Sequence, residues 1–221
     1  MLTHHDQVVS IALYLVDLDA PGISVGDALD WLTPAEQKRY ENQIEGASRK
    51  RFAIGRASLR KLVDAPAGSS DFSIGPNGKP HLPGGPHFSF AASLNHALIG
   101  ITVAGPIGLD IETVRDIRPG TDWPQLYPAL GAMQRGAERP GDSQAVRFLR
   151  AWTRLEALIK RDGGRLGRAL DQRSAVADLP PDSSEVLDLE LGGNLVSALA
   201  YYGSAKTELK RVDARGLLAE A

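Results

Sequence analysis

The sequence predicts an α+β fold, and three features of its pattern support this prediction. An apolar, β-branched run over residues 8–18 is typical of a buried strand. Two longer segments, 47–63 and 143–162, keep the apolar period of helices that pack on one face. Each of these helices precedes further strand-like runs, so two parts of the chain share a rough order of elements. No sequence repeat accompanies that order.

The first helix has a complete N-terminal signal in "LTPAEQKRY". Thr33 can cap it, Pro34 suits the first helical position, and Glu36 completes a capping box. The helix over 47–63 follows and carries basic residues between its apolar positions. It ends in the loop "DAPAGSSDF", and "GPNGKPHLPGGP" consists of turn residues throughout.

Strands are expected after this turn. "HALIGITVA" and "IGLDIE" predict a hairpin, with Gly105 and Pro106 as its turn. Residues 115–142 are rich in loop residues and predict no clear element. Ser143 then caps the second long helix, which a Gly-Gly pair ends. The tail alternates loops with the strand-like runs "EVLDLEL", "LVSALAYY" and "TELKRV".

Composition excludes several classes of function. With 221 residues, 43% of them hydrophobic and 24% charged, the chain is expected to form one globular domain or two small ones packed together. It has no cysteine, which excludes disulfides and thiolate sites. A net charge of −2 gives no overall attraction to nucleic acid or membranes. Neither a signal-peptide pattern nor a membrane-spanning run is seen, so we expect a cytoplasmic protein.

Two acids in "GLDIE" carry the first chemical signal. On a strand, Asp110 and Glu112 project to the same side, while Ile111 faces the core. Two such carboxylates repel each other unless a cation lies between them, and an oxygen-only arrangement suits Mg²⁺. The alternative is an exposed strand edge with two solvated acids.

The segment "WTRLEALIK" carries the second signal. Trp152, Glu156 and Lys160 lie along one side of a helix, at positions i, i+4 and i+8. The alternative is a core tryptophan beside a surface ion pair that contributes about 0.3–0.5 kcal/mol. A meeting of Glu156 with the acids of "GLDIE" would instead complete a cation site.

Basic residues supply the remaining candidates, each with a plain alternative. Lys79 in "NGKP" is either an exposed turn lysine or a phosphate contact. The run "SRKRFAIGRASLRK" has no acid and is either a solvated helix face or a site for a polyanion. Residues 147–173 carry eight basic and three acidic residues, which would either steer an acidic partner at low salt or form an ordinary solvated surface.

In order and spacing, these fragments together resemble 4′-phosphopantetheinyl transferases of the surfactin-synthetase type. The resemblance rests on "RFAIGR", "NGKP", "FSF..S", "GPIGLDIE" and "FLRAWTRLEALIK", and extends from about residue 31 to 202. Its most specific parts are "GLDIE" and the pattern W-x-x-x-E-x-x-x-K. Enzymes of this family transfer the phosphopantetheine arm of coenzyme A to a serine of an acyl or peptidyl carrier protein and release 3′,5′-ADP.

The resemblance implies a monomeric pseudo-dimer of two similar halves, residues 1–105 and 106–221. Each half would be a small antiparallel sheet with a packed long helix, and the active-site cleft would lie between them. Mg²⁺ and the substrate coenzyme A would occupy this cleft. The chain would have a carrier protein as its partner, and neither nucleic acid nor a membrane.

The resemblance also implies roles for single residues. The metal-binding acids would be Asp110, Glu112 and Glu156. Lys160 would act near the pyrophosphate of coenzyme A, while Arg51 and Lys79 would contact its nucleotide phosphates. Glu156 or a metal-bound water would take the proton of the carrier serine. Phosphoryl transfer of this kind depends mainly on positioning and on neutralising charge.

Three positions depart from the family pattern. The pattern F-x-x-S-H-S falls on "FSFAAS", so Ala91 and Ala92 replace its Ser-His pair, while Ser93 is kept as a coenzyme A contact. His96 is a candidate substitute, but four residues further along an extended strand it would lie about 13 Å away. Leu155 replaces the lysine that usually precedes the metal-binding glutamate.

These departures leave two interpretations. Two lost hydrogen bonds to a charged ligand, each worth about 1.5–3 kcal/mol, would weaken coenzyme A binding roughly 100-fold or more. The chain is then a weak or specialised transferase, or a degenerate member that acts as a binding or regulatory protein. The retained acids favour the enzyme, because paired carboxylates without a cation repel each other.

Overall fold

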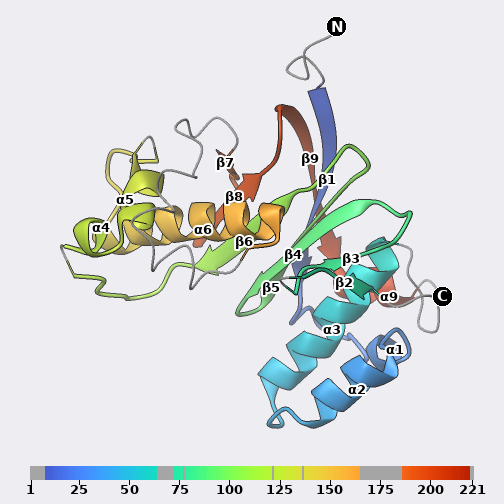
Figure 1. Ribbon diagram of the computed structural model, residues 1–221. Helices are drawn as coiled ribbons and strands as arrows, with labels where there is room; N and C mark the ends of the chain where they lie inside the picture. The colour runs from blue at the N-terminus through green and yellow to red at the C-terminus, as the bar shows by residue number, and fades with distance from the viewer. Residues whose placement is uncertain are drawn as a thin grey trace, which may run out of the picture.

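The computed structural model describes residues 8–63, 72–76, 78–120, 122–135, 137–164 and 186–219. Two larger sheets, each with a long helix packed against it, make up most of the molecule (Figure 1). The mixed α and β content predicted from the sequence is confirmed. Within the described ranges, no helix is long and apolar enough to cross a membrane.

The first sheet has the strand order β4-β5-β1-β9. Its strands are β1 (Val8–Asp17), β4 (His87–Ser93), β5 (His96–Thr102) and β9 (Ser204–Asp213). Antiparallel pairs join β4 to β5 and β5 to β1, whereas β9 runs parallel to β1. The sheet is therefore mixed, and not purely antiparallel as expected, because a strand from the far end of the chain completes it.

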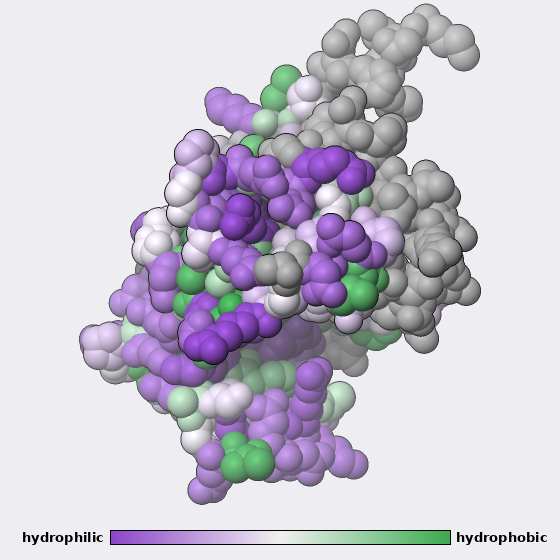
Figure 2. All heavy atoms as spheres, turned by 90° about the vertical axis from the view of Figure 1, so that its left-hand side faces the viewer, coloured by the Kyte–Doolittle hydropathy of each residue, from purple (hydrophilic) through white to green (hydrophobic). Residues whose placement is uncertain are grey.

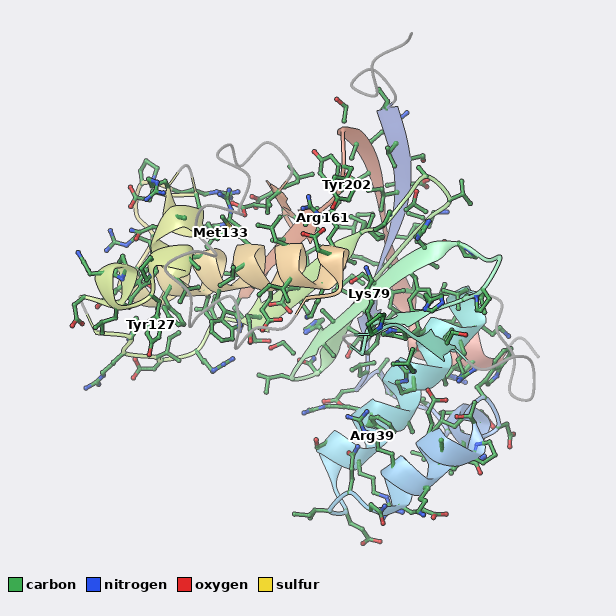
Figure 3. All side chains as sticks on the ribbon, viewed as in Figure 1. Arg39, Lys79, Tyr127, Met133, Arg161 and Tyr202 are labelled. Carbon is green, nitrogen blue, oxygen red and sulfur yellow. The ribbon has the colours of Figure 1, made fainter. Side chains whose placement is uncertain are left out.

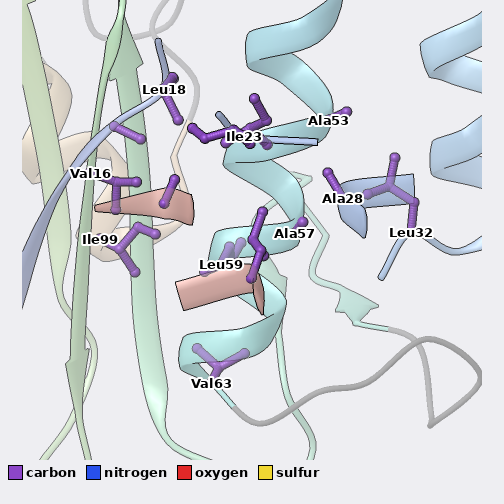
Figure 4. Close-up of a cluster of buried hydrophobic side chains, with 14 of the residues drawn as sticks. Val16, Leu18, Ile23, Ala28, Leu32, Ala53, Ala57, Leu59, Val63 and Ile99 are labelled. Atoms are coloured by element: carbon purple, nitrogen blue, oxygen red, sulfur yellow. The ribbon is translucent and has the colours of Figure 1, made fainter. Parts of the chain in front are cut away.

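Helices and a small second sheet lie beside the first sheet. They are α1 (Val25–Leu29), α2 (Pro34–Glu41), α3 (Ala47–Leu62), β2 (Ser73–Ile74) and β3 (Pro80–His81). The predicted capping box forms at the start of α2, where Thr33 Oγ1 accepts a hydrogen bond from the Glu36 backbone N–H. Figure 4 shows Val16 and Ile99 of the sheet facing Leu59 of α3 in the buried core.

The other large sheet and its helices come from the second part of the chain. They are β6 (Gly108–Thr113), β7 (Val186–Asp188), β8 (Leu195–Ala200), α4 (Trp123–Leu126), α5 (Pro128–Gln134) and α6 (Gln144–Asp162), whereas α9 (Ala214–Ala219) packs against α3 beside the first sheet. The strand order is β6-β8-β7, with antiparallel pairs. The Ser143 side chain caps α6, and Gly163 ends it in the left-handed conformation, as predicted. Helices α4 and α5 lie in the segment that gave no clear prediction.

The predicted hairpin between β5 and β6 is wrong. β5 pairs with β4 and β1, whereas β6 crosses to the other sheet and pairs with β8. The actual hairpin joins β4 to β5 through Leu94 and Asn95, and Leu94 has a φ of 51°. This turn escaped prediction because it contains neither glycine nor proline.

A shared apolar core joins the two large sheets. Its buried members include Leu13 and Leu98 from the first sheet, and Leu109 and Ile111 from β6. Because side chains alternate along a strand, the even-numbered residues of β6 point away from this core, toward α6. The fold thus directs the two acids of "GLDIE" at the helix that carries Glu156 and Lys160.

Candidate active site

Asp110 and Lys160 form the centre of the site. The Lys160 ammonium lies 2.6 Å from Asp110 Oδ1 and 3.9 Å from Glu156 Oε2. Asp110 is buried, whereas the Lys160 side chain is one third exposed. Two motifs about fifty residues apart in the sequence therefore meet in the structure.

A close approach of α6 to β6 makes this meeting possible, and Gly108 permits it. A Cβ atom at position 108 would lie 1.9 Å from the Ala157 carbonyl oxygen and 2.4 Å from the Arg161 backbone nitrogen. No side chain fits in that space, so the helix backbone rests directly on the strand. Asp110 follows two residues later and points to the same side.

Glu112 lies nearer to the start of α6 than Asp110 does, and it lines a cavity with Phe148 and Trp152. Its Oε2 accepts hydrogen bonds from Ser93 Oγ at 3.0 Å and from Arg115 Nη1 at 2.8 Å. Ser93 is buried and also accepts a hydrogen bond from the Thr113 backbone N–H at 3.0 Å. Its hydroxyl is thus committed to β6, and is not free for a ligand.

Electrostatics mark Asp110 as an unusual acid. Burial, together with the nearby charges of Glu156 and Glu112, raises its pKa to about 6, although Lys160 opposes the shift. Its second oxygen, Oδ2, is buried and has no hydrogen-bond partner among the described residues. Asp110 thus has an unfilled acceptor, and the charges of two further carboxylates act on it.

The donors of this site suit a hard cation. They are three carboxylates, and Asp110 among them has a buried oxygen without a partner, so all the ligands are oxygen atoms. Across the described ranges, however, no group of three or more His, Asp or Glu residues is arranged to hold a metal ion directly. The ammonium of Lys160 lies close to both Asp110 and Glu156 instead. A cation would therefore have to displace Lys160 from Asp110.

The raised pKa of Asp110 gives a prediction for the metal-free protein. The unfolded chain releases this proton near pH 3.8 and the folded chain near pH 6, so ionisation costs the folded state free energy above pH 6. We expect Asp110→Asn to raise the free energy of unfolding at pH 8 by up to about 3 kcal/mol. The gain should shrink as the pH falls through 6 and vanish below about 4, as measured by urea unfolding.

Asp19 provides the control with the opposite sign. Its hydrogen bond from Arg51 lowers the pKa of Asp19, so its ionised form stabilises the fold at neutral pH. Asp19→Asn should therefore lose stability at pH 8 and recover it in acid. Equal responses of the two variants would contradict the assignment of a raised pKa to Asp110.

A cavity of about 440 Å³ adjoins Lys160. Its lining residues come from 36–90 and from 159–164, so both halves of the chain contribute to it. Its polar and apolar walls include Arg39, Arg56, Lys79, Ser89, Ile159 and Lys160. Figure 2 shows this side of the molecule hollowed between the body that carries α6 and the helices below it. Cations on its wall suit an anionic ligand.

Two arginines on the helical wall of this cavity differ in their pairing. Arg56 is paired with Glu36 at 2.6 Å. Arg39 lies 5.1 Å from the centre of the Phe52 ring, and the described structure shows no ion pair for it (Figure 3). Arg39 was not predicted as a site residue, although its place one turn after Glu36 puts it on the side of α2 that meets α3.

Lys79 lines the cavity, but its ammonium already donates hydrogen bonds to the protein (Figure 3). Its ammonium donates hydrogen bonds to the backbone carbonyls of Ile107 at 2.9 Å and Arg161 at 3.0 Å. Burial lowers the pKa of Lys79. The side chain thus ties the turn before β6 to the end of α6, with one N–H donor left over.

Arg51 lies in a second cavity, of about 660 Å³, and pairs with Asp19. Arg39, Phe52, Arg56 and Phe90 line both cavities, so the two form one groove. Ala92 is exposed and faces this second cavity, whereas Ala91 is buried in the core between the sheets. Of these two alanines, only Ala92 could therefore contact a ligand in the groove.

The expected separation of His96 is wrong. Because the chain reverses at Leu94 and Asn95, His96 pairs directly with Ser93 across the hairpin, and Ala92 pairs with Ala97. Cβ atoms of such paired residues lie about 5 Å apart, so His96 is a neighbour of this end of β4. Its Nδ1 is buried without a hydrogen-bond partner in the described structure.

Leu155 is fully buried in the core beneath α6, with Ala151 and Leu158. Position 155 does not line either part of the groove. A lysine there would bury its charge in an apolar cluster, which is costly. Leucine at this position is thus explained by packing.

Three of the five described basic residues in the segment expected to steer a partner are internal. Arg150, Arg154 and Arg161 are buried. Arg154 pairs with Asp188 at 2.7 Å, and Arg161 pairs with Asp162 at the same distance. Residues 165–173, which supplied three more of the predicted cations, lie outside the described ranges.

No family model matches the chain, but several known proteins are similar to it and share one name. The chain is 29% identical over 168 residues to the slr0495 protein of Synechocystis, covering 72% of this chain and 68% of that protein. The name of slr0495 assigns it provisionally as a 4′-phosphopantetheinyl transferase.

Two further relatives carry that name without qualification. The chain is 33% identical over 127 residues to 4′-phosphopantetheinyl transferase AcpT of Salmonella typhimurium, and 31% identical over 131 residues to AcpT of Escherichia coli. It spans 62% and 63% of these two proteins, which is less than two thirds of their lengths. None of the names specifies the surfactin-synthetase type. Over more than half of its length, the chain is thus similar to enzymes named 4′-phosphopantetheinyl transferases, at about 30% identity.

Proposed function

We propose that the chain transfers the 4′-phosphopantetheine group of coenzyme A to a serine of an acyl or peptidyl carrier protein, with Mg²⁺ as cofactor. The products are the holo-carrier protein and 3′,5′-ADP. One observation carries the proposal: Asp110, Glu156 and Lys160 converge beside a groove whose walls carry cations. Relatives named 4′-phosphopantetheinyl transferases support it. We further propose a cytoplasmic monomer that binds neither nucleic acid nor membranes.

Coenzyme A would lie in the groove between residues 1–105 and residues 106–221. The groove's two parts, of about 440 and 660 Å³, are in the size range of ligand sites. Arg39 and the spare donor of Lys79 would face the nucleotide phosphates, with Arg51 further along. The diphosphate would lie next to Lys160, at the end of the groove nearest the acids.

Asp110, Glu112 and Glu156 would hold Mg²⁺, which when bound would neutralise charge on the diphosphate. Lys160 would then leave Asp110 and donate to a diphosphate oxygen. The carrier serine Oγ forms a bond to the phosphorus that bears the pantetheine arm, and the bond from that phosphorus to the oxygen of 3′,5′-ADP breaks. Glu156 takes the serine proton.

Calorimetric titration of coenzyme A, with and without Mg²⁺, tests the proposal first. We expect binding with Mg²⁺ present, and affinity at least about 10-fold weaker without it, because the acids would then repel the diphosphate. Mass spectrometry of fatty-acid, polyketide and peptide-synthetase carrier proteins then tests transfer. Absence of coenzyme A binding at millimolar concentration with Mg²⁺ would sink the proposal.

A second candidate is a degenerate relative that binds a ligand or protein partner without transfer. The contact between Lys160 and Asp110 favours it, because this ion pair neutralises the acid without a metal ion. An affinity for coenzyme A that is the same with and without Mg²⁺, with no carrier protein modified, would support this second candidate over the enzyme.

A further inference from the structure

Ser93 links a strand of the first sheet to an acid of the candidate site. It lies at the end of β4 and is only 8% exposed. Its hydroxyl oxygen is 3.0 Å from the Thr113 backbone nitrogen and 3.0 Å from Glu112 Oε2. Both contacts are to β6, so Ser93 bridges the two sheets.

The direction of these two hydrogen bonds is fixed by chemistry. A backbone N–H can only donate, so Ser93 Oγ accepts from Thr113. The hydroxyl has a single proton, and that proton points at the Glu112 carboxylate. Hydrogen bonds to a charged acceptor are stronger than neutral ones. Ser93 therefore holds Oε2 of Glu112 in place, together with Arg115 at 2.8 Å.

Ser89 makes a similar link between β4 and β6, but this link involves no acid. It lies on the same face of β4, is equally buried, and accepts a hydrogen bond from the Leu109 backbone N–H at 2.9 Å. Both serines bond a residue twenty positions further along the chain. Only the Ser93 hydroxyl also contacts an acid in the described structure.

We propose that Ser93 is a positioning residue that orients Glu112 for metal binding, and not a contact to coenzyme A. The inference rests on the proposed function, and replaces the role that the family resemblance implies for this serine. Ser93 lines neither part of the groove, whereas its neighbours Ala92 and Leu94 do. A buried hydroxyl that is committed twice to β6 has no proton left for a phosphate.

The test is Mg²⁺ binding, measured by calorimetry on the full chain with coenzyme A present. Ser93→Ala should raise the Mg²⁺ dissociation constant about 10-fold or more, as losses of outer-shell partners do. The dissociation constant of coenzyme A at saturating Mg²⁺ should change less than about 2-fold. Ser93→Thr, which keeps the hydroxyl, should recover Mg²⁺ affinity to within about 3-fold of wild type.

Thr102→Val is the control, because it removes a buried hydroxyl that accepts from a backbone N–H but donates to a backbone carbonyl instead of an acid, away from the groove. It should leave the Mg²⁺ dissociation constant within about 2-fold of wild type. In a Glu112→Ala background, Ser93→Ala should cause no further loss of Mg²⁺ affinity, because Ser93 is proposed to affect the metal only through Glu112. If Ser93→Ala does not fold, Ser93→Cys, with its weaker donor, should give an intermediate loss.

The outcomes separate this inference from the proposed function. Equal effects of Ser93→Ala and Thr102→Val on Mg²⁺ affinity, with an active wild type, would overturn the positioning role alone. So would a loss of coenzyme A affinity without a change for Mg²⁺. A wild-type chain that binds coenzyme A but never Mg²⁺ would overturn both the inference and the proposed mechanism.

Discussion

Replacing Asp110 and Glu112 together by alanine is expected to lower kcat/KM for carrier modification by about 1000-fold or more. The double substitution removes two of the three carboxylates that would hold Mg²⁺. One preorganised group that stabilises transition-state charge is worth about 3 to 4 kcal/mol, which corresponds to a factor of 100 to 1000. Holo-carrier formation, followed by mass spectrometry, measures the loss.

Loss of activity should occur without loss of the fold. Ionised Asp110 costs the metal-free protein stability at pH 8, because burial and two neighbouring acids raise its pKa to about 6. Lys160 loses its contact with Asp110, but it keeps Glu156 at 3.9 Å and is one third exposed to solvent. The double variant should therefore unfold at a temperature no lower than wild type, and Mg²⁺ should no longer raise that temperature.

The control removes the same two negative charges elsewhere. Glu190 and Glu208 have side chains that are 74% and 70% exposed, and neither lines any part of the groove. Their double alanine variant should modify the carrier protein at the wild-type rate, within about 2-fold. Activity of the Asp110 and Glu112 double variant within 10-fold of wild type would rule out the proposed cation site.

Elements with local signals were predictable from the sequence. The capping box at Thr33 and Glu36 forms, and α6 begins and ends where Ser143 and Gly163 indicate. Strand alternation alone puts Asp110 and Glu112 on one face of β6, opposite Ile111. These features depend on residues close together in the chain, so tertiary packing was not needed to find them.

Features that depend on distant pairing were not predictable in the same way. Nothing in the sequence of β9 says that it runs parallel to β1, and the crossing of β6 to another sheet depends on which apolar faces meet. The role of Ser93 needed the distance between β4 and β6. Leu94 and Asn95 make a tight turn in which leucine, a residue unusual in this conformation, has a φ of 51°.

Gly108→Ala is expected to destabilise the protein severely, by about 3 kcal/mol or more in the free energy of unfolding. The added methyl would lie 1.9 Å from the Ala157 carbonyl oxygen and 2.4 Å from the Arg161 nitrogen. Both are backbone atoms inside α6, so no side-chain rotation relieves the clash, and the helix must move away from β6. Thermal unfolding should shift down by about 6 °C or more.

The same movement should damage the site, because Glu156 and Lys160 travel with the helix while Asp110 stays on the strand. Gly216→Ala is the matched control, since a Cβ there meets nothing within 4 Å and alanine favours the helical conformation of α9. It should leave stability unchanged or raise it by up to about 1 kcal/mol. A Gly108→Ala protein as stable as the Gly216→Ala protein would mean that α6 does not rest on β6. Because that contact brings the two motifs together, the candidate site would then lose its structural basis.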